Sequence, residues 1–487
     1  MSAYDQFLQS HPAYATTGAI DALRATEYAR LDTQDQVYLD FTGGGLHAAS
    51  QVQEHALMLA QQVLGNPHSV NPSSMEMTQR VESARAAVLA YFNGTSEYTA
   101  IFTLNASGAL KLVGESYPFE PGARLLLATD NHNSVNGIRE FAQGRGASVG
   151  YAPLTRPDLR LDVAAMQALL SQRDGAHAKL LAFPAQSNFS GVKHPLELVA
   201  QAQAAGWQVL LDAAAFVPTN RLDLRAVSPD FVAMSFYKMF GYPTGVGCLL
   251  VRNQALGSLK RPWFGGGTVN FATVQGRMHV LSSGEAGFED GTLNYLSIPA
   301  VEIGLKHLQR VGVETIQTRV HCLTGWLISE LLALQHGNGR PLVRLYGPAT
   351  MKERGGTVTI NFYDPEGHLL DYRRIEELAA LERISLRTGC FCNPGAGETA
   401  EDLSEDDMRV GIAEVGADIN LQRFLQVLQG RGGKSAGAIR VSTGIASNFA
   451  DVQRFLRFAA RLRDQSTLTV GAASFDIASC RVVRDGG

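Results

Sequence analysis

The sequence predicts an α/β fold in which a mostly parallel sheet is flanked by helices and is followed by a smaller α+β domain. Short apolar runs alternate with segments of helical periodicity, which is typical of parallel strands joined by crossover helices. The runs expected as strands are Thr99–Thr103, Arg124–Ala128, Lys179–Phe183, Val209–Asp212 and Phe231–Ser235. Val246–Arg252 follows after a turn too short for a crossover, so we expect an antiparallel neighbour there. A chain of 487 residues is long enough for both domains.

The domain boundaries are expected where this alternation changes. We predict a large domain over residues 36–300 and a smaller α+β domain over 301–465, with residues 1–35 packed on the smaller domain. Residues 466–487 form a tail without a clear pattern. Ile298–Leu334 has long helical periodicity, and later strands are expected at Thr357–Phe362, Ile384–Arg387 and Ala438–Ser442.

Composition narrows the class of function. The 42 basic residues against 46 acidic ones give a net charge of -4, which favours neither nucleic acid nor an anionic membrane as a partner. The sequence has no apolar stretch long enough to span a bilayer, and Met1–Gln6 does not resemble a signal peptide, so we expect a cytoplasmic protein acting on small metabolites. Five cysteines do not make a disulfide framework, so an important cysteine here would be a reactive thiol.

Two charged residues stand at the ends of successive apolar runs. Lys238 lies where such a run meets a glycine-rich turn, and Asp212 ends the preceding strand. Partial burial of the lysine supplies the neutral amine that a Schiff base requires. An acid to pair a pyridine nitrogen and a lysine to hold an aldehyde together indicate pyridoxal 5'-phosphate. Taken singly, each residue is more often a solvated surface group.

The other strand ends add polar groups of matching chemistry. Ser107 opens a helix whose backbone N–H groups suit a phosphate, and His132 follows the next strand, where an imidazole can stack on a ring and move protons. Asn188 offers an amide to the phenolic oxygen of the cofactor. Each segment alone also fits an ordinary capped helix or turn. Because open α/β sheets bind ligands at these ends, the conjunction favours a cofactor site.

Five longer strings carry a resemblance to a known family. They are Phe183–Lys193, Leu211–Thr219, Ser235–Gly245, Phe288–Asn294 and Arg387–Gly395. With them the chain resembles, over about residues 35 to 465, the class V or cysteine desulfurase-like fold type I pyridoxal phosphate enzymes. Within that class it is similar to the N-terminal desulfurase domain of eukaryotic molybdenum cofactor sulfurases. The resemblance implies a mostly parallel seven-stranded sheet in the large domain.

The resemblance also implies roles for individual residues. Lys238 matches the Schiff-base lysine, Asp212 the pyridinium partner, His132 the stacking histidine and Asn188 the amide near the phenolic oxygen. Thr292 matches a residue that reaches the phosphate of a partner subunit, which implies a homodimer. The phosphate-binding turn and a further phosphate ligand correspond to Ala106, Ser107, Gly108 and Ser235.

The same resemblance implies chemistry on L-cysteine. Arg440 matches the arginine that grips the substrate carboxylate, a role suited to its planar fork. Cys392 aligns with the cysteine that takes sulfur as a persulfide while alanine leaves. We expect Arg387 to bind substrate and to lower the pKa of the Cys392 thiol. Cys390 fits a half-buried small residue, and two cysteines at this spacing do not make a metal site.

Two departures distinguish the chain from ordinary cysteine desulfurases. Tyr237 stands where those enzymes usually carry histidine, and Asp212 is followed by three alanines, so proton handling is expected to rely on Tyr237, His132 and Lys238. Molybdenum cofactor sulfurases continue into a C-terminal domain that receives the cofactor, and this sequence ends at Gly487. We therefore do not expect this chain alone to sulfurate the molybdenum cofactor.

Two kinds of alternative share some of these residues. Another class V enzyme, such as a C–S lyase acting on a cysteine conjugate, an epimerase or an aminotransferase, would keep the same cofactor residues. The other is a non-catalytic scaffold that binds the cofactor or a sulfur-acceptor protein, and the intact Lys238, Asp212 and His132 argue against it. The final sulfur acceptor, a protein or a cofactor, is not encoded in any motif of the sequence.

Overall fold

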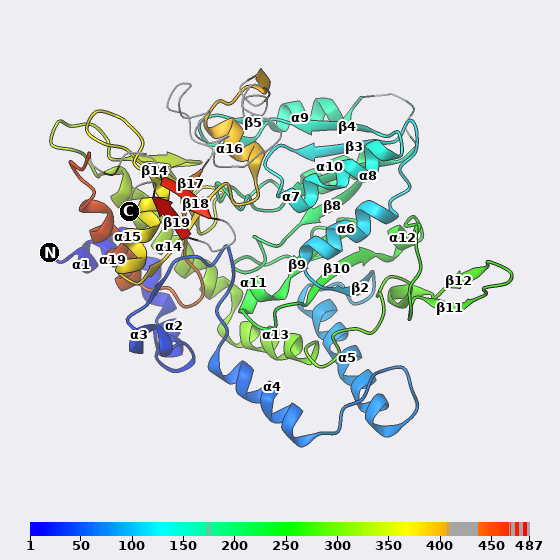
Figure 1. Ribbon diagram of the computed structural model, residues 1–487. Helices are drawn as coiled ribbons and strands as arrows, with labels where there is room; N and C mark the ends of the chain where they lie inside the picture. The colour runs from blue at the N-terminus through cyan, green and yellow to red at the C-terminus, as the bar shows by residue number, and fades with distance from the viewer. Residues whose placement is uncertain are drawn as a thin grey trace.

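A seven-stranded sheet forms the centre of the protein in the computed structural model (Figure 1). The structure describes residues 1–172, 175, 177–406, 409, 437–466 and 468, and the backbone of strands 473–476 and 481–484. The strand order is β2-β10-β9-β8-β7-β3-β4. The strands are β2 (Tyr98–Thr103), β10 (Gly247–Arg252), β9 (Phe231–Ser235), β8 (Gln208–Asp212), β7 (Lys179–Pro184), β3 (Arg124–Ala128) and β4 (Ser148–Ala152).

The predicted fold class is confirmed. Strands β9, β8, β7, β3 and β4 pair in parallel, while β10 lies antiparallel to both β2 and β9, as its short connection predicted. Strand β4 was not predicted. Most of its residues are exposed or half-buried, because it is the edge strand, so it lacks the continuous apolar run that marks the central strands.

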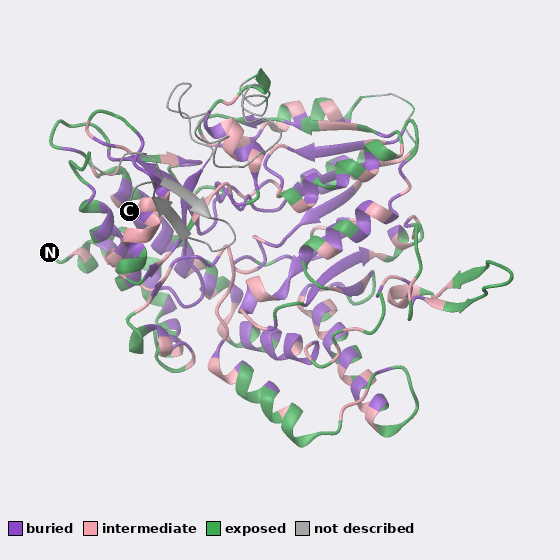
Figure 2. Ribbon diagram, in the orientation of Figure 1, coloured by how far each residue is buried: buried purple, intermediate pink, exposed green. Residues whose placement is uncertain are grey.

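Helices cover both faces of this sheet, and successive strand residues alternate between the two faces. On one side Leu125 and Leu127 pack with residues of α6 and α8, whereas Leu126 between them packs with α5, α9, α10 and α13 on the other. Figure 2 shows the strands as largely buried. The covering helices are α5 (Pro72–Tyr91), α6 (Ala106–Ser116), α7 (Asn133–Asn136), α8 (Ile138–Gly144), α9 (Val163–Leu170), α10 (Leu198–Ala204) and α13 (Pro299–Val311).

A second, antiparallel sheet has the order β13-β14-β17-β16. Its strands are β13 (Val343–Tyr346), β14 (Thr357–Phe362), β17 (Ala438–Ser442) and β16 (Arg387–Gly389). One predicted strand, Ile384–Arg387, was wrong in its extent. Its first residues form β15 (Ile384–Ser385), which pairs in parallel with β1 (Val37–Tyr38), while Arg387 begins β16 in the second sheet.

Helices α14 (Val313–Leu332), α15 (Tyr372–Leu381), α16 (Pro394–Ala400) and α19 (Phe449–Ala460) accompany this second sheet. The long helical segment predicted at Ile298–Leu334 is two helices, α13 and α14. Gly312 separates them because it adopts a positive φ of 84°, which other residues rarely adopt.

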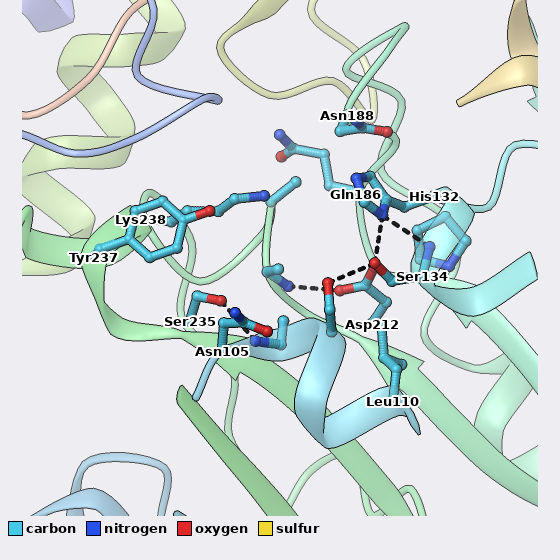
Figure 3. Close-up of a pocket in the computed structure, with 15 residues that line it drawn as sticks. Asn105, Leu110, His132, Ser134, Gln186, Asn188, Asp212, Ser235, Tyr237 and Lys238 are labelled. Atoms are coloured by element: carbon cyan, nitrogen blue, oxygen red, sulfur yellow. Dashed lines mark hydrogen bonds between the residues drawn. The ribbon is translucent and has the colours of Figure 1, made fainter. Parts of the chain in front are cut away.

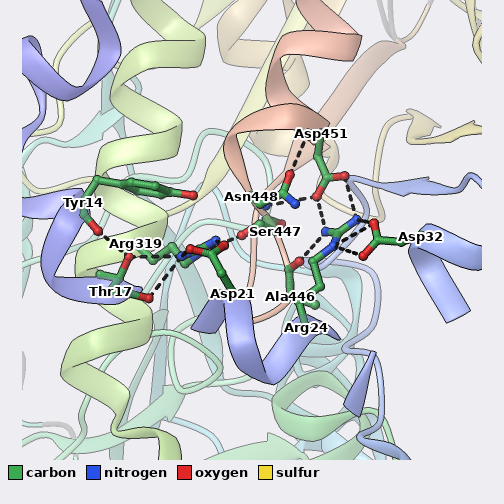
Figure 4. Close-up of polar contacts among 10 residues, drawn as sticks. All are labelled: Tyr14, Thr17, Asp21, Arg24, Asp32, Arg319, Ala446, Ser447, Asn448 and Asp451. Atoms are coloured by element: carbon green, nitrogen blue, oxygen red, sulfur yellow. Dashed lines mark hydrogen bonds and ion pairs between the residues drawn. The ribbon is translucent and has the colours of Figure 1, made fainter. Parts of the chain in front are cut away.

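The N-terminal segment packs against these later elements (Figure 4). It comprises α1 (Ala3–Ser10), a 3-10 turn (Pro12–Thr17), α2 (Ala19–Glu27) and α3 (Arg30–Thr33). Arg319 of α14 is fully buried and donates to the carbonyl of Ser447 at 2.7 Å while pairing with Asp21. Arg24 pairs with Asp451 at 2.5 Å and with Asp32 at 2.8 Å. Of these ion pairs, Arg24–Asp451 is buried on both sides, and it links α2 to α19 near the other end of the chain.

Several elements project from this body. Helix α4 (Ala49–Gln61) has an exposed face, and the hairpin of β11 (Val269–Ala272) and β12 (His279–Leu281) extends away from the sheet, as Figures 1 and 2 show. Further short elements complete the described fold: α11 (Phe236–Phe240), α12 (Asn253–Leu256), β5 (Leu154–Thr155), β6 (Arg160–Leu161) and a 3-10 turn at Gly284–Gly287.

In the tail, β18 (Ala473–Asp476) pairs antiparallel with β19 (Arg481–Arg484), and Cys480 lies outside the described residues. None of the described helices combines the length and the apolar character needed to cross a bilayer.

Candidate active site

The predicted site residues from five strand ends line one pocket (Figure 3). It lies at the carboxyl ends of β2, β3, β7, β8 and β9, where open α/β sheets bind their ligands. Its lining comprises Asn105, Ala106, Ser107, Leu110, His132, Ser134, Pro184, Gln186, Asn188, Asp212, Ala214, Ala215, Ser235, Tyr237 and Lys238.

Lys238 lies on α11, directly after β9, and its side chain borders the pocket. The residue as a whole is only half-buried, but the surroundings of its amine disfavour the charged form. Burial lowers the pKa of Lys238, and the charges of Arg440 and Arg387 act in the same direction, while Asp212 opposes them. A larger fraction of this amine is therefore neutral than in an ordinary lysine, as a nucleophile requires.

Asp212 ends β8 and is 9% exposed. Its carboxylate accepts a hydrogen bond from the backbone N–H of Ala214 at 3.0 Å, which fixes its orientation toward the pocket. A buried carboxylate with a fixed direction suits a protonated ring nitrogen as its partner.

His132 caps α7, and the N–H of Ser134 donates to its Nδ1 at 3.1 Å. Because Nδ1 accepts this bond, the proton of the neutral imidazole resides on Nε2. Burial lowers the pKa of His132, and the charges of Lys238 and Arg440 lower it further against the opposing effect of Asp212. At neutral pH the ring is therefore uncharged.

Three hydroxyl groups gather at the N-terminus of α6. Ser107 Oγ lies 2.6 Å from Ser134 Oγ, and Ser235 Oγ accepts from the N–H of Ala106 at 2.8 Å. The N–H of Gly108 donates to the side chain of Asn105, the N-cap, at 3.0 Å. The hydroxyls and the helix N-terminus together form a polar end of the pocket that suits a phosphate.

The loop that carries Cys390 and Cys392 contacts the segments that follow β3 and β7. The N–H of Asn133 donates to the carbonyl of Cys392 at 2.7 Å, and Asn188 Nδ2 donates to the carbonyl of Phe391 at 2.8 Å. One N–H of the Asn188 amide thus serves the loop, and the predicted bond to a phenolic oxygen would use the other. Phe391 and Cys392 both have φ values of 55°, a strained conformation for side chains of this size. Cys392 is exposed and Cys390 is half-buried.

Arg387 and Arg440 meet across strands β16 and β17, which pair at these two residues. Arg440 is buried and donates to the carbonyl of Asn188 at 3.2 Å, and its guanidinium lies over the ring of Phe391. Both arginines bind the carboxylate of Asp40. Burial lowers the pKa of Arg440, and the charges of Asp40 and Cys392 act in the opposite direction. The predicted effect of Arg387 on the Cys392 thiol stays a prediction.

Tyr237 borders the pocket beside Lys238. Burial raises the pKa of its phenol, with Asp40 contributing and Arg387 opposing, so the side chain is a proton donor at neutral pH. Its carbonyl accepts from the N–H of Gly45 at 3.0 Å. A Cβ at Gly45 would lie 2.9 Å from the Lys238 carbonyl, so only glycine permits this approach of the N-terminal segment.

Thr292 does not line this pocket, and its predicted contact with the phosphate of a partner subunit stays a prediction. Thr292 is exposed and lines a separate hollow beside Gly108 and Gly245. Conversely, sequence reasoning missed Ser134 and Asp40. Asp40 follows the apolar run Val37–Leu39, so the strand-end argument applied to Asp212 would have found it.

The arrangement fits pyridoxal 5'-phosphate on chemical grounds. The polar helix end, the buried carboxylate and the amine with a lowered pKa lie on one pocket wall, and they match the phosphate, the ring nitrogen and the aldehyde of that cofactor. The fold and this site together define a fold type I pyridoxal phosphate enzyme.

Comparisons with known proteins place the chain in a family. The family described as aminotransferase class-V matches residues 37–455, so the chain belongs to it, and pyridoxal 5'-phosphate is its cofactor. Molybdenum cofactor sulfurase of Solanum lycopersicum is 38% identical over 94% of this chain. This chain spans only 59% of the length of that relative.

Solved structures share the fold at lower identity. The apo cysteine desulfurase of Thermococcus onnurineus NA1 superposes with a TM-score of 0.73 at 22% identity, over 91% of this chain and 97% of that one. The cystine C–S lyase C-DES, in complex with its reaction product cysteine persulfide, has a TM-score of 0.65 at 20% identity, over 87% and 97% of the two chains. At these identities the likeness concerns the fold.

Proposed function

We propose that this chain is a cysteine desulfurase that takes sulfur from L-cysteine as a persulfide on Cys392 and releases alanine. One observation carries the proposal: the exposed Cys392 sits on a loop that is hydrogen-bonded to the His132 and Asn188 loops of the cofactor pocket. The names of the relatives, molybdenum cofactor sulfurase and cysteine desulfurase, support the same chemistry.

In this proposal the chain's own residues hold both reactants. The α6 N-terminus with Ser107 and Ser235 holds the phosphate, Asp212 pairs with the ring nitrogen, and His132 stacks on the ring. Arg440 and Arg387 bind the substrate carboxylate. When bound, pyridoxal phosphate supplies an acceptor for the electrons released at the substrate Cα.

Proton transfers fall to three side chains with shifted pKa values. Lys238, with a lowered pKa, takes the Cα proton as a neutral amine and returns it to the product. Tyr237, with a raised pKa, donates rather than accepts at neutral pH. His132 presents an Nε2–H because its Nδ1 accepts from Ser134, so it orients and relays a proton without carrying a charge.

The sulfur step is a transfer between two thiols. The Cys392 thiolate attacks the substrate Sγ, an S–S bond forms as the Cβ–Sγ bond breaks, and the carbon receives a proton. The overall change converts L-cysteine and the enzyme thiol into L-alanine and an enzyme persulfide, which balances in atoms and electrons. A second thiol, on an acceptor protein or cofactor, then takes the sulfur.

The test is a single-turnover measurement of products. Purified holoenzyme mixed with L-cysteine, without added thiol, should form one alanine and one bound persulfide per active site. Pyruvate with free thiol would indicate a lyase, and an inverted or transaminated amino acid would indicate the epimerase or aminotransferase alternatives. A lack of turnover with every thiol amino acid would favour the scaffold.

We further propose that the enzyme acts as a homodimer. The supporting observation is a set of exposed apolar side chains on α4, the segment after it, the start of α5 and the β11–β12 hairpin, namely Leu57, Val63, Val70, Met75, Phe271, Val274, Met278 and Val280. Exposed apolar surface of this kind marks protein interfaces. Sedimentation should give twice the monomer mass of 52.4 kDa, and a monomer at all concentrations would contradict the proposal.

A further inference from the structure

Two arginines beside the cofactor pocket share one internal carboxylate. Arg387 donates to Asp40 Oδ2 from Nε at 2.9 Å and from Nη2 at 2.7 Å, while Arg440 donates from Nη2 to Asp40 Oδ1 at 3.1 Å. Asp40 is 6% exposed, and it comes from a segment more than 340 residues away in the sequence. Of the carboxylates in the described part of the chain, Asp40 alone forms an ion pair with Arg387 or Arg440.

The charges of this cluster do not cancel. Two guanidinium groups and one carboxylate leave one positive charge, and the buried Nε of Arg440 has no hydrogen-bond partner among the described residues. Glu376 lies near Arg387, but it accepts from Thr388 Oγ1 at 2.5 Å and burial raises its pKa. Arg440 and Asp40 are both buried, so the remaining positive charge lies on Arg387, whose side chain is about half exposed and can reach an anion in the solvent.

Asp40 is held firmly in this position. Its carbonyl accepts from the N–H groups of Gly43 and Gly44 at 3.0 and 3.1 Å, and it pairs with Ser442 in a parallel bridge. A Cβ at Gly43 would lie 2.6 Å from both carboxylate oxygens of Asp40. The turn therefore leaves room for the carboxylate only because residue 43 has no side chain.

We propose that Asp40 sets the charge of the Arg387–Arg440 pair at plus one and thereby restricts the substrate site to amino acids with a single carboxylate. Asp40 is a positioning and specificity-determining residue, since it acts through the two arginines. The inference rests on the proposed role of those arginines as the carboxylate-binding pair. One positive charge matches one α-carboxylate, whereas a second acidic group would remain uncompensated beside Asp40.

The test measures binding of two amino acids that differ by one charge. Each would be titrated into the holoenzyme, with the visible absorbance of the cofactor as readout: L-alanine with one carboxylate and L-aspartate with two. In Asp40→Asn, which keeps the shape of the side chain, the ratio of the L-aspartate Kd to the L-alanine Kd should fall about tenfold, because the pair now carries two charges.

The matched control is Asp35→Asn, on the same segment. Asp35 pairs with Arg454 at the surface at 2.6 Å, and its loss should leave the ratio unchanged. An unchanged ratio in Asp40→Asn, with an intact cofactor spectrum, would overturn the proposal.

Arg387→Gln provides a second measurement of opposite sign. Its side chain is about half exposed, so the substitution should leave folding intact, and it removes one positive charge while Asp40 stays. L-Alanine should bind about tenfold more weakly and the Kd ratio should rise. A ratio that does not rise would overturn the proposal even if Asp40→Asn did not fold. Neither titration requires desulfuration, so failure to form alanine from L-cysteine would count against the proposed function alone.

Discussion

The predicted site residues form two groups, which we call the cofactor wall and the cysteine wall, and the two groups are held in place in different ways. The cofactor wall, with Lys238, Asp212 and His132, is formed at the carboxyl ends of β9, β8 and β3 of one hydrophobic sheet. The cysteine wall, with the predicted substrate and sulfur residues Arg387, Arg440 and Cys392, depends on ion pairs and hydrogen bonds between distant segments. None of these three residues is among those that line the pocket. The first wall is positioned by apolar packing, and the second by polar contacts that can exchange with a ligand.

The largest effect should come from breaking the cofactor wall. Lys238→Ala removes the amine that holds the cofactor aldehyde and moves the Cα proton, so turnover should fall by about 10⁴-fold or more. The visible absorbance of lysine-bound cofactor should disappear, while cofactor added in excess still binds through its phosphate. Retention of that absorbance would mean that another amine serves.

Removing the thiol of Cys392 should separate cofactor binding from sulfur transfer. Cys392→Ser should keep the cofactor absorbance but reduce alanine formation without added thiol at least about a hundredfold, because no thiolate is left to attack the sulfur. Persulfide labelling of the intact protein measures the loss. The control is Cys390→Ser, two residues away, which should retain the persulfide. Equal rates for Cys392→Ser and the unmodified enzyme would remove Cys392 from the mechanism.

A substitution at Gly241, directly after the helix of Lys238, should lower the stability of the protein more than it alters the reaction. Gly241 follows the helix of Lys238 with φ of 79°, and a Cβ there would lie 2.2 Å from the N of His47. Gly241→Ala should lower the free energy of unfolding by about 3 kcal/mol, through both strain and this clash.

The control for this substitution is Gly122→Ala. Gly122 has φ of 91° with nothing within 4 Å of an added Cβ, so it should lose only about 1 kcal/mol. Urea unfolding of both variants measures the difference. Equal losses would show that the close approach to His47 contributes nothing.

The smallest effect concerns pH. The pKa of His132 is lowered below 6.5 in the folded state, so the unfolded chain binds more protons as the pH falls through 6.5, and stability decreases there. His132→Asn keeps a good helix N-cap but does not titrate, so it should lose less stability between pH 7.5 and 5.5 than the unmodified chain. Urea unfolding at both pH values tests this, and an equal loss in the two proteins would contradict it.

The difference between the walls also explains what the sequence could predict. The cofactor residues were found because each follows a continuous apolar run, such as Val209–Leu211 before Asp212. The edge strand β4 escaped because it carries no such run. The contact of Asp40 with Arg387 and Arg440 has no local signature, since it joins residues 347 and 400 positions apart. Long-range ion pairs are set by the folded topology and not by neighbouring residues.

The late position of Asp40's partners has a consequence for synthesis on the ribosome. All seven strands of the large sheet lie between residues 98 and 252, so the cofactor half can form while the rest of the chain is still being translated. Asp40 emerges near the beginning but meets Arg440 only after some 400 further residues have been added. The lining of the cofactor pocket, residues 105–238, can therefore be in place before Arg387, Cys392 and Arg440 have been synthesised.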